Sequence, residues 1–367
     1  MHKSLAIFST GFGSSFIDAH LKDLNPGKTV AVGTYGPTPL TSMWPVCCPA
    51  FFLDHWEQKK SVRLARHLGF QSEWLKNRFI EKFLRQHQVE VVLGEYLDQF
   101  LPFVPMMDRL GIPYVVQGHG YDVSAKLREP EILRKIGAYA SAKAILTRCE
   151  FHRQRLIKLG LPEDKIHVNF GGVTVPASVP VRQPGNGKRL LAIGLMVPKK
   201  GPIYLLEAFR LAALKDPELS LDFVGGGALY PAAVQFINAC GLKDRVRLHG
   251  FASEEVKKNL VNECGVFVQH SITDPETGNE EGLPAAIQEA MAHGMAVVST
   301  RHAGILEAVI EGKTGLLVDE GDVEGMAQAF LAVGEQAQIF GEEGYTEAVK
   351  RHSWVHERDR LRGWLFS

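Results

Sequence analysis

The sequence has few cysteines and no obvious metal ligands. Its five cysteines form no C-x-x-C pair, and the spacing of its histidines matches no zinc site. No D-x-D occurs, so a divalent cation held on paired aspartates is not supported. We therefore expect reduced thiols, no metal and no bound cofactor.

Long apolar runs are also missing. No segment approaches the roughly 18 residues that a membrane-spanning helix needs. The apolar run Ala6-Ile7-Phe8 is too short for the core of a signal peptide. We therefore expect a cytoplasmic protein, and its 367 residues are enough for two domains of ordinary size.

The chain has no net charge, but its halves differ. Residues 1–178 hold 22 basic and 16 acidic residues, whereas the remainder holds 19 and 25. A basic first half and an acidic second half suggest different partners for each. We expect no nucleic-acid partner.

Short apolar runs alternate with helical patterns along both halves. This alternation predicts an α/β protein with parallel sheets. A stretch rich in proline, glycine and polar residues, 176–187, predicts the linker. We expect domains over 1–178 and 179–350, with the C-terminal helix 351–367 packed back onto the first.

The most informative stretch is NEEGLPAAIQEAMAHG, residues 279–294. It follows an apolar run, 266–268, that is typical of a buried strand. Proline suits the first position of a helix, so we expect a helix from Leu283 or Pro284 to about His293. Gly294 would end it in the left-handed conformation.

The start of this helix could bind a phosphate. The amides of Gly282, Leu283 and Ala285 would lie at the positive end of the helix dipole. Carboxylates on either side, from Glu281 and Glu289, could hold the hydroxyls of a nucleotide sugar. The alternative is an ordinary capped helix with Glu289 in solvent.

Two other strand-to-helix turns could contact the same ligand. The first, after strand 4–8, contains Gly11 and Gly13, and a purely structural tight turn is an equal alternative for Gly11 but a weaker one for Gly13. It is not a dinucleotide fingerprint, because Phe16 occupies the third glycine position. The second, GLMVPKKG, runs from Gly194 to Gly201, and its lysines could neutralise a diphosphate.

His119 lies just past the strand 113–116, where parallel sheets place ligands. Its alternative is a purely structural role. The stretch 59–86 is predicted to be a basic helix with an apolar stripe, Leu75, Phe79, Ile80, Phe83 and Leu84. A solvated basic face and a surface for anionic lipid headgroups both remain open for it.

These motifs resemble the retaining glycosyltransferases of family 4, which have the GT-B fold of two Rossmann-like α/β/α domains facing a central cleft. The resemblance rests on the E-x7-E spacing of Glu281 and Glu289, on HGYD at 119–122, and on 295–318. The resemblance implies a hexosyltransferase and extends to polysaccharide-building members, and the absence of D-x-D leads us to expect that it is metal-independent. It would move a sugar from a nucleotide-diphosphate sugar to a glycan or lipid-linked acceptor.

The resemblance also implies residue roles. Glu281 would hold the sugar, Lys200 the diphosphate and Glu289 the ribose, while His119 would lie by the sugar. Gly13 and Gly194 would lie against the donor. An arginine usual in the family is replaced by Leu195, and either Arg189 or Lys199 could substitute for it.

Two other functions fit the same fold. An epimerase or a phosphorylase would need its own base or phosphate site. A non-catalytic nucleotide-sugar binding protein would bind the donor without turnover, and the missing arginine keeps this alternative open.

Overall fold

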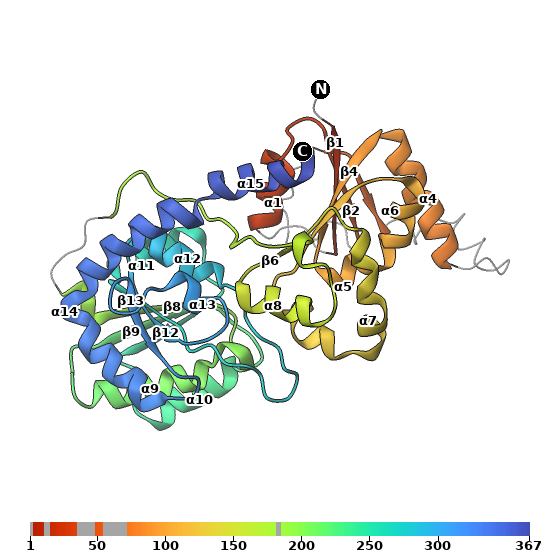
Figure 1. The fold of residues 1–367 in the computed structure, drawn as a ribbon. Coiled ribbons are helices and arrows are strands. Elements are labelled where there is room, and N and C mark those ends of the chain that lie inside the picture. Colours follow the sequence, from red (N-terminus) through yellow and green to blue (C-terminus); the bar gives the residue numbers. More distant parts are fainter. Residues whose placement is uncertain (1–2, 11–14, 35–47, 54–71, 181–184) are drawn as a thin grey trace. The chain divides into compact units, whose positions relative to one another are not determined.

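The computed structural model describes residues 3–10, 15–34, 48–53, 72–180 and 185–367. These form two compact units (Figure 1). Unit 1 comprises residues 1–169 and 357–367, and unit 2 comprises residues 170–356. The chain therefore passes between units at Asn169–Phe170, whereas the sequence places the boundary at 178–179.

Unit 1 is built on a seven-stranded parallel sheet with strand order β3-β2-β1-β4-β5-β6-β7. Its strands are β1 (Ser4–Ser9), β2 (Thr29–Gly33), β3 (Ala50–Phe52), β4 (Val89–Glu95), β5 (Tyr114–Gln117), β6 (Ala144–Thr147) and β7 (Ile166–Val168). Its helices include α1 (Ser15–Asp23), α4 (Ser72–Gln86), α5 (Leu97–Phe100), α6 (Val104–Leu110), α7 (Pro130–Lys135) and α8 (Glu150–Lys158). The sequence analysis missed β2, β3 and β7.

Unit 2 holds a six-stranded parallel sheet with strand order β10-β9-β8-β11-β12-β13. Its strands are β8 (Arg189–Ile193), β9 (Ser220–Val224), β10 (Val246–Gly250), β11 (Val266–Val268), β12 (Ala296–Thr300) and β13 (Gly315–Val318). Its helices are α9 (Pro202–Ala213), α10 (Tyr230–Ala239), α11 (Glu254–Glu263), α12 (Ala285–Ala292), α13 (Ile305–Ala308) and α14 (Val323–Glu347). The prediction of two parallel-sheet α/β domains is confirmed.

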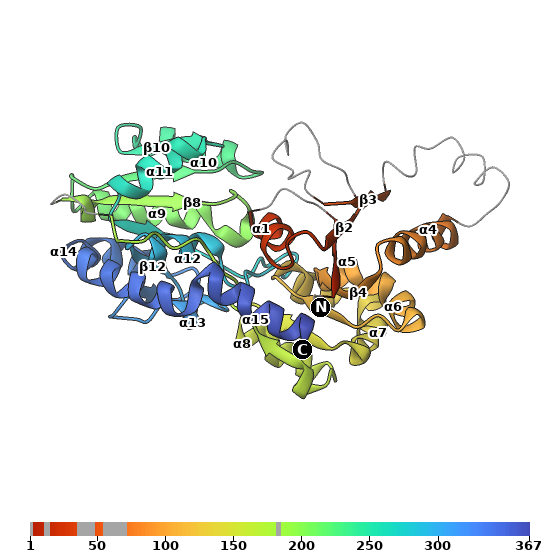
Figure 2. The ribbon, with the colours of Figure 1, turned by 90° about the horizontal axis from the view of Figure 1, so that it is seen from above.

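Both faces of the unit 2 sheet are covered, as Figure 2 shows from above. Alternate residues of each strand point to opposite faces. Val266 and Val268 of β11 therefore pack with α9, α10 and α14, while Phe267 packs with α12 and α13. Burial on both sides explains why these strands appear in the sequence as continuous apolar runs.

The last helix, α15 (Trp354–Phe366), begins in unit 2 and ends in unit 1. Within unit 1, Leu361 and Leu365 are fully buried. Glu357 of the same segment accepts a hydrogen bond from Nη1 of Arg148 at 2.9 Å. The C-terminal residues are therefore part of the core of unit 1.

Candidate active site

The strand order of unit 2 fixes where a ligand can bind. The chain builds β8, β9 and β10 toward one edge and then returns to place β11 on the other side of β8. Open parallel sheets bind ligands beyond the carboxyl ends of the two strands at such a reversal. The loops in that place follow β8 and β11, and they carry Lys200 and Glu281.

Glu281 joins the two loops. Its carboxylate pairs with Nζ of Lys199 at 3.0 Å through one oxygen, and with Nζ of Lys200 at 3.2 Å through the other. Burial alone would raise the pKa of Glu281, but the charges of Lys200 and Lys199 outweigh it and lower the pKa to about 2. The carboxylate is therefore ionised, and one of the two ammonium charges remains unbalanced.

The helix after Glu281 begins one or two residues later than predicted. The first residue of α12 is Ala285, and Pro284 is the extended residue before it, with φ −63° and ψ 122°. The stop at Gly294 has the expected positive φ, 67°. Within the described chain, no acceptor is paired with the amides of Gly282, Leu283 or Ala285.

Glu289 lies on the exposed side of α12, as the alternative of a solvated residue also requires. Its surroundings still affect it. Desolvation raises its pKa, Lys257 lowers it, and Glu254 raises it further. Hydrogen bonds donated by ligand hydroxyls would oppose this upward shift of the pKa, because they stabilise the charged form.

Two residues are the candidates to replace the arginine whose usual position in the resembled family is taken by Leu195. Leu195 is 52% exposed and offers no charge. Arg189 begins β8, at the other end of a five-residue strand, and pairs with Glu263 at 2.9 Å. Lys199 lies beside Lys200 on Glu281, so of these two candidates only Lys199 is in place. Gly194 is adjacent, because a Cβ there would lie 3.8 Å from Cε of Lys200.

In unit 1, the turn after β5 places His119. Asp122 is fully buried and holds this turn by accepting the amides of His119 at 2.8 Å and Gly120 at 3.0 Å. The same carboxylate accepts the amide of Leu97 at 2.8 Å. The acid of the HGYD run therefore has a structural role, which is to shape the loop that presents the histidine.

Both ring nitrogens of His119 are engaged. Nε2 lies 2.8 Å from a carboxylate oxygen of Glu95, and Nδ1 lies 3.3 Å from Nε of Arg148. Because a guanidinium can only donate, Nδ1 must accept and Nε2 must carry the proton. A ring hydrogen bond from His119 to a ligand therefore requires Arg148 or Glu95 to be displaced first. Its role beside the sugar stays a prediction.

Behind His119 lies a buried charge cluster. Nδ1 of His20 is 2.6 Å from Glu95, and both side chains are fully buried. Burial would lower the pKa of His20, but Glu95 and Glu357 outweigh it and raise the pKa to about 9. Burial likewise opposes ionisation of Glu95, yet His20 and His119 hold its pKa well below the usual range. His20 is therefore charged at neutral pH.

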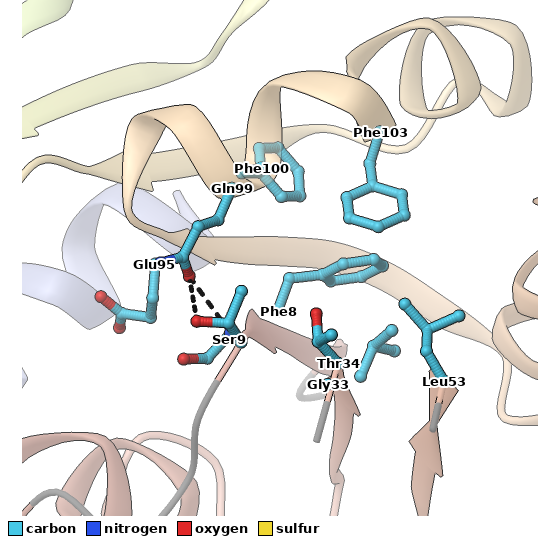
Figure 3. A pocket seen from close by; sticks show the side chains of 11 residues that line it. Phe8, Ser9, Gly33, Thr34, Leu53, Glu95, Gln99, Phe100 and Phe103 are labelled. Carbon is cyan, nitrogen blue, oxygen red and sulfur yellow. Dashed lines mark hydrogen bonds between the residues drawn. The ribbon is translucent and has the colours of Figure 1, made fainter. Parts of the chain in front are cut away.

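A small pocket lies at the corresponding reversal of unit 1, beyond the ends of β1, β2 and β4 (Figure 3). Phe8, Phe100 and Phe103 form one side of it. Gln99 accepts hydrogen bonds from the amide and hydroxyl of Thr10 at 3.2 and 2.7 Å. Gly13, predicted to lie against the donor, is outside the described residues.

The basic stretch 59–86 is described only from residue 72. Ile80 and Leu84 of α4 are fully buried as predicted, but Phe79 is 40% exposed, so it does not belong to the buried stripe. Lys76 and Arg85 pair with acids of the same helix. Much of the predicted basic character of α4 is therefore balanced locally.

The described residues offer neither a metal site nor a helix that could span a membrane. No group of three or more histidine, cysteine, aspartate or glutamate side chains is arranged to hold a metal ion there. No described helix is both long and apolar enough to span a membrane.

Each half of the chain matches a family model of known proteins. Residues 35–175 match the family model described as Glycosyltransferase Family 4. Residues 178–346 match the model described as Glycosyl transferases group 1. The chain carries two glycosyltransferase domains.

Named relatives of these glycosyltransferase domains include enzymes of exopolysaccharide synthesis. The putative colanic acid biosynthesis glycosyltransferase WcaL of Escherichia coli is 30% identical over 59% of this chain and 54% of its own length. The amylovoran biosynthesis glycosyltransferase AmsK of Erwinia amylovora is 29% identical over the same shares. The chain spans about half the length of these relatives.

Solved structures confirm the GT-B fold. Anabaena Alr3699/HepE, in complex with UDP and glucose, superposes with a TM-score of 0.77 at 16% identity and covers 99% of both chains. Sucrose-phosphate synthase of Thermosynechococcus elongatus gives 0.74 at 15% identity, with 98% of this chain and 97% of that one covered.

Several residues around Glu281 and His119 were not predicted. Glu95, Arg148 and Glu357 fix His119 or its surroundings, and His302 and Glu320 lie behind Glu281. Their sequence separations are large, so no local spacing reveals them. Glu95, an acid ending a buried apolar strand, is the one residue with a recognisable signal.

His20 gives a prediction for stability against pH. Its folded-state pKa of about 9 lies above the ordinary 6.5, so its contribution is fully present below about pH 6.5 and is lost as the pH rises through 9. We expect the unfolding free energy in urea to fall by on the order of 2–3 kcal/mol between pH 6.5 and 9. His20→Gln should flatten this slope; an unchanged slope would mean that His20 does not carry the charge.

Proposed function

We propose that this protein is a retaining glycosyltransferase that moves a sugar from a nucleotide-diphosphate sugar to a glycan or lipid-linked acceptor. The observation that carries the proposal is the ionised carboxylate of Glu281 between two lysines at the strand reversal of unit 2. The UDP and glucose bound to HepE support a nucleotide-sugar donor. The E-x7-E resemblance supports retention.

The site would work by stabilising the leaving group. As the bond between the sugar and the diphosphate breaks, negative charge develops on the phosphate oxygen. Lys199, Lys200 and the amides before α12 would receive that charge, and preorganised donors in a water-poor site are most effective there. Glu281 would bind sugar hydroxyls, and Glu289 would bind the ribose.

The lysines would have to change partner during binding. In the free protein both hold Glu281. A diphosphate carries more negative charge than a carboxylate, so we expect both ammonium groups to shift toward it. The carboxylate of Glu281 would then be free to accept hydrogen bonds from the sugar.

Glu281→Gln tests this arrangement. We expect turnover to fall by roughly 10²-fold or more, because the carboxylate acts on the reacting sugar. Affinity for the nucleoside diphosphate should hold or rise, because an anion competing for the lysines is removed. The donor is first found by a thermal-shift screen of UDP, GDP and their sugars, and turnover is measured as nucleoside diphosphate released.

Glu276→Gln, in the same loop but exposed, is the matched control and should leave turnover unchanged. Normal turnover in the Glu281 variant would refute the proposed role. Release that depends on free phosphate would indicate a phosphorylase, isomerisation without an acceptor an epimerase, and tight donor binding without any turnover a binding protein.

Lys199 and Lys200 give a second test. Each charged hydrogen bond to phosphate contributes about 1.5–3 kcal/mol, so we expect Lys199→Met and Lys200→Met each to weaken binding of UDP or GDP by roughly 10-fold or more. Binding of the nucleoside without phosphate should not change. Lys215→Met, exposed beyond the far end of α9, is the control. If calorimetry shows that the Lys199 variant binds UDP or GDP with wild-type affinity, Lys200 would be the only one of the two lysines that binds the diphosphate.

We also propose that α4 contacts anionic lipid through its exposed face, which carries Trp74, Arg78 and Lys82. Trp74 is 51% exposed, and the guanidinium of Arg78 lies 5.3 Å from the centre of its ring. Arg78 and Lys82 form no ion pair with an acid among the described residues, and they face the same side of α4, one turn apart. An aromatic ring beside basic residues suits the membrane interface.

Vesicle sedimentation tests this contact. Binding should require anionic phosphatidylglycerol, fall with salt, and drop several-fold in Arg78→Glu/Lys82→Glu, since each basic residue near such a surface contributes about 1 kcal/mol. The double variant Lys215→Glu/Lys243→Glu, which reverses two exposed lysines of unit 2, is the charge-matched control. Equal sedimentation with neutral and anionic vesicles would end the membrane hypothesis.

A further inference from the structure

One buried histidine connects three loops behind Glu281. His302 follows β12 and is only 2% exposed. Its Nε2 accepts the backbone amide of Glu281 at 3.1 Å, and its Nδ1 lies 2.5 Å from Oε1 of Glu320. These three residues follow β12, β11 and β13, which are neighbours in the sheet.

The hydrogen bonds fix the state of this ring. A backbone amide can only donate, so Nε2 of His302 must carry a lone pair. The proton is therefore on Nδ1, which donates it to the carboxylate of Glu320. The other oxygen of Glu320 accepts the amide of Thr273 at 2.7 Å, so Glu320 is itself held in place.

A second contact reinforces the first. The amide of Gly304 donates to the carbonyl of Gly282 at 2.9 Å, so two consecutive residues of the acidic loop are tied to the loop after β12. Ala303, between the two anchoring residues, has a φ of +39°, which is costly for a residue with a side chain. This strained conformation lets the ring of His302 and the amide of Gly304 both contact residues 281–282.

We propose that His302 is a positioning residue for Glu281, oriented by Glu320. The inference rests on the function proposed for Glu281. The side chain of Glu281 is anchored by two lysines in the free protein, and it would lose both when a diphosphate binds them. The backbone bond to His302 would remain, and it would keep the carboxylate beside the sugar when its side-chain partners have moved.

Two amide substitutions separate this role from packing. The terminal amide of glutamine reaches about as far as Nε2, whereas that of asparagine reaches about as far as Nδ1. His302→Gln can therefore still accept the amide of Glu281, and His302→Asn can still donate to Glu320 but cannot reach Glu281. Both remove the aromatic ring, so a purely structural role predicts equal effects.

We expect His302→Gln to keep turnover within about 3-fold of wild type and His302→Asn to lose roughly 10–100-fold, because small misplacements of a catalytic group are costly. Turnover is measured as release of UDP or GDP from the nucleotide sugar that the thermal-shift screen identifies as the donor. The dissociation constant of the free nucleoside diphosphate should change less than about 3-fold in either variant, since the lysines are untouched.

Equal losses in the two variants, or a loss confined to nucleoside diphosphate affinity, would overturn the inference. If Glu281→Gln is inactive and His302→Asn is fully active, the inference fails while the proposed function stands. If Glu281→Gln has normal turnover, the proposed function itself fails. Thermal unfolding of both His302 variants identifies any loss that comes from misfolding.

Discussion

The arrangement of unit 2 depends on one buried carboxylate shared by two lysines. Removing Glu281 from water is unfavourable, and the pKa shows that the attraction of Lys199 and Lys200 outweighs this cost. Such compensation requires the loops after β8 and β11 to bring the Nζ atoms of the two lysines within 3.0–3.2 Å of the carboxylate oxygens of Glu281. They can do so because the strand order places β8 and β11 side by side. Topology therefore creates the site, and charge pairing holds it in place.

Unit 1 shows the same principle with different groups. Its strand order reverses between β1 and β4, and β4 ends in Glu95. That carboxylate receives two histidines, His20 and His119, instead of two lysines. The difference matters chemically, because His20 loses its charge as the pH rises through its pKa of about 9, below the ordinary pKa of a lysine. The cluster in unit 1 therefore depends on pH in a range where the cluster in unit 2 does not.

The sequence was sufficient for features that depend on neighbouring residues. The apolar runs predicted the strands β1, β5 and β11, the glycine at 294 predicted the end of α12, and the family resemblance singled out Glu281 and Lys200. It failed for β2, β3 and β7, which have at most five residues each and lie beside stretches of sequence without clear periodicity. It also could not predict that Arg148 and Glu95 engage both nitrogens of His119, because those contacts join separate strands and their loops.

The unpredicted residues have one property in common: each contacts a side chain or backbone group that is distant from it in the sequence. His302 contacts Glu281 across 21 positions, and Arg148 contacts Glu357 across 209. A buried polar group must find a partner somewhere in the fold, since leaving it unpaired costs about 1–3 kcal/mol. These partners are therefore set by how the strands are ordered. The proposed chemistry of Glu281 consequently relies on residues that become its neighbours only when the sheet has formed.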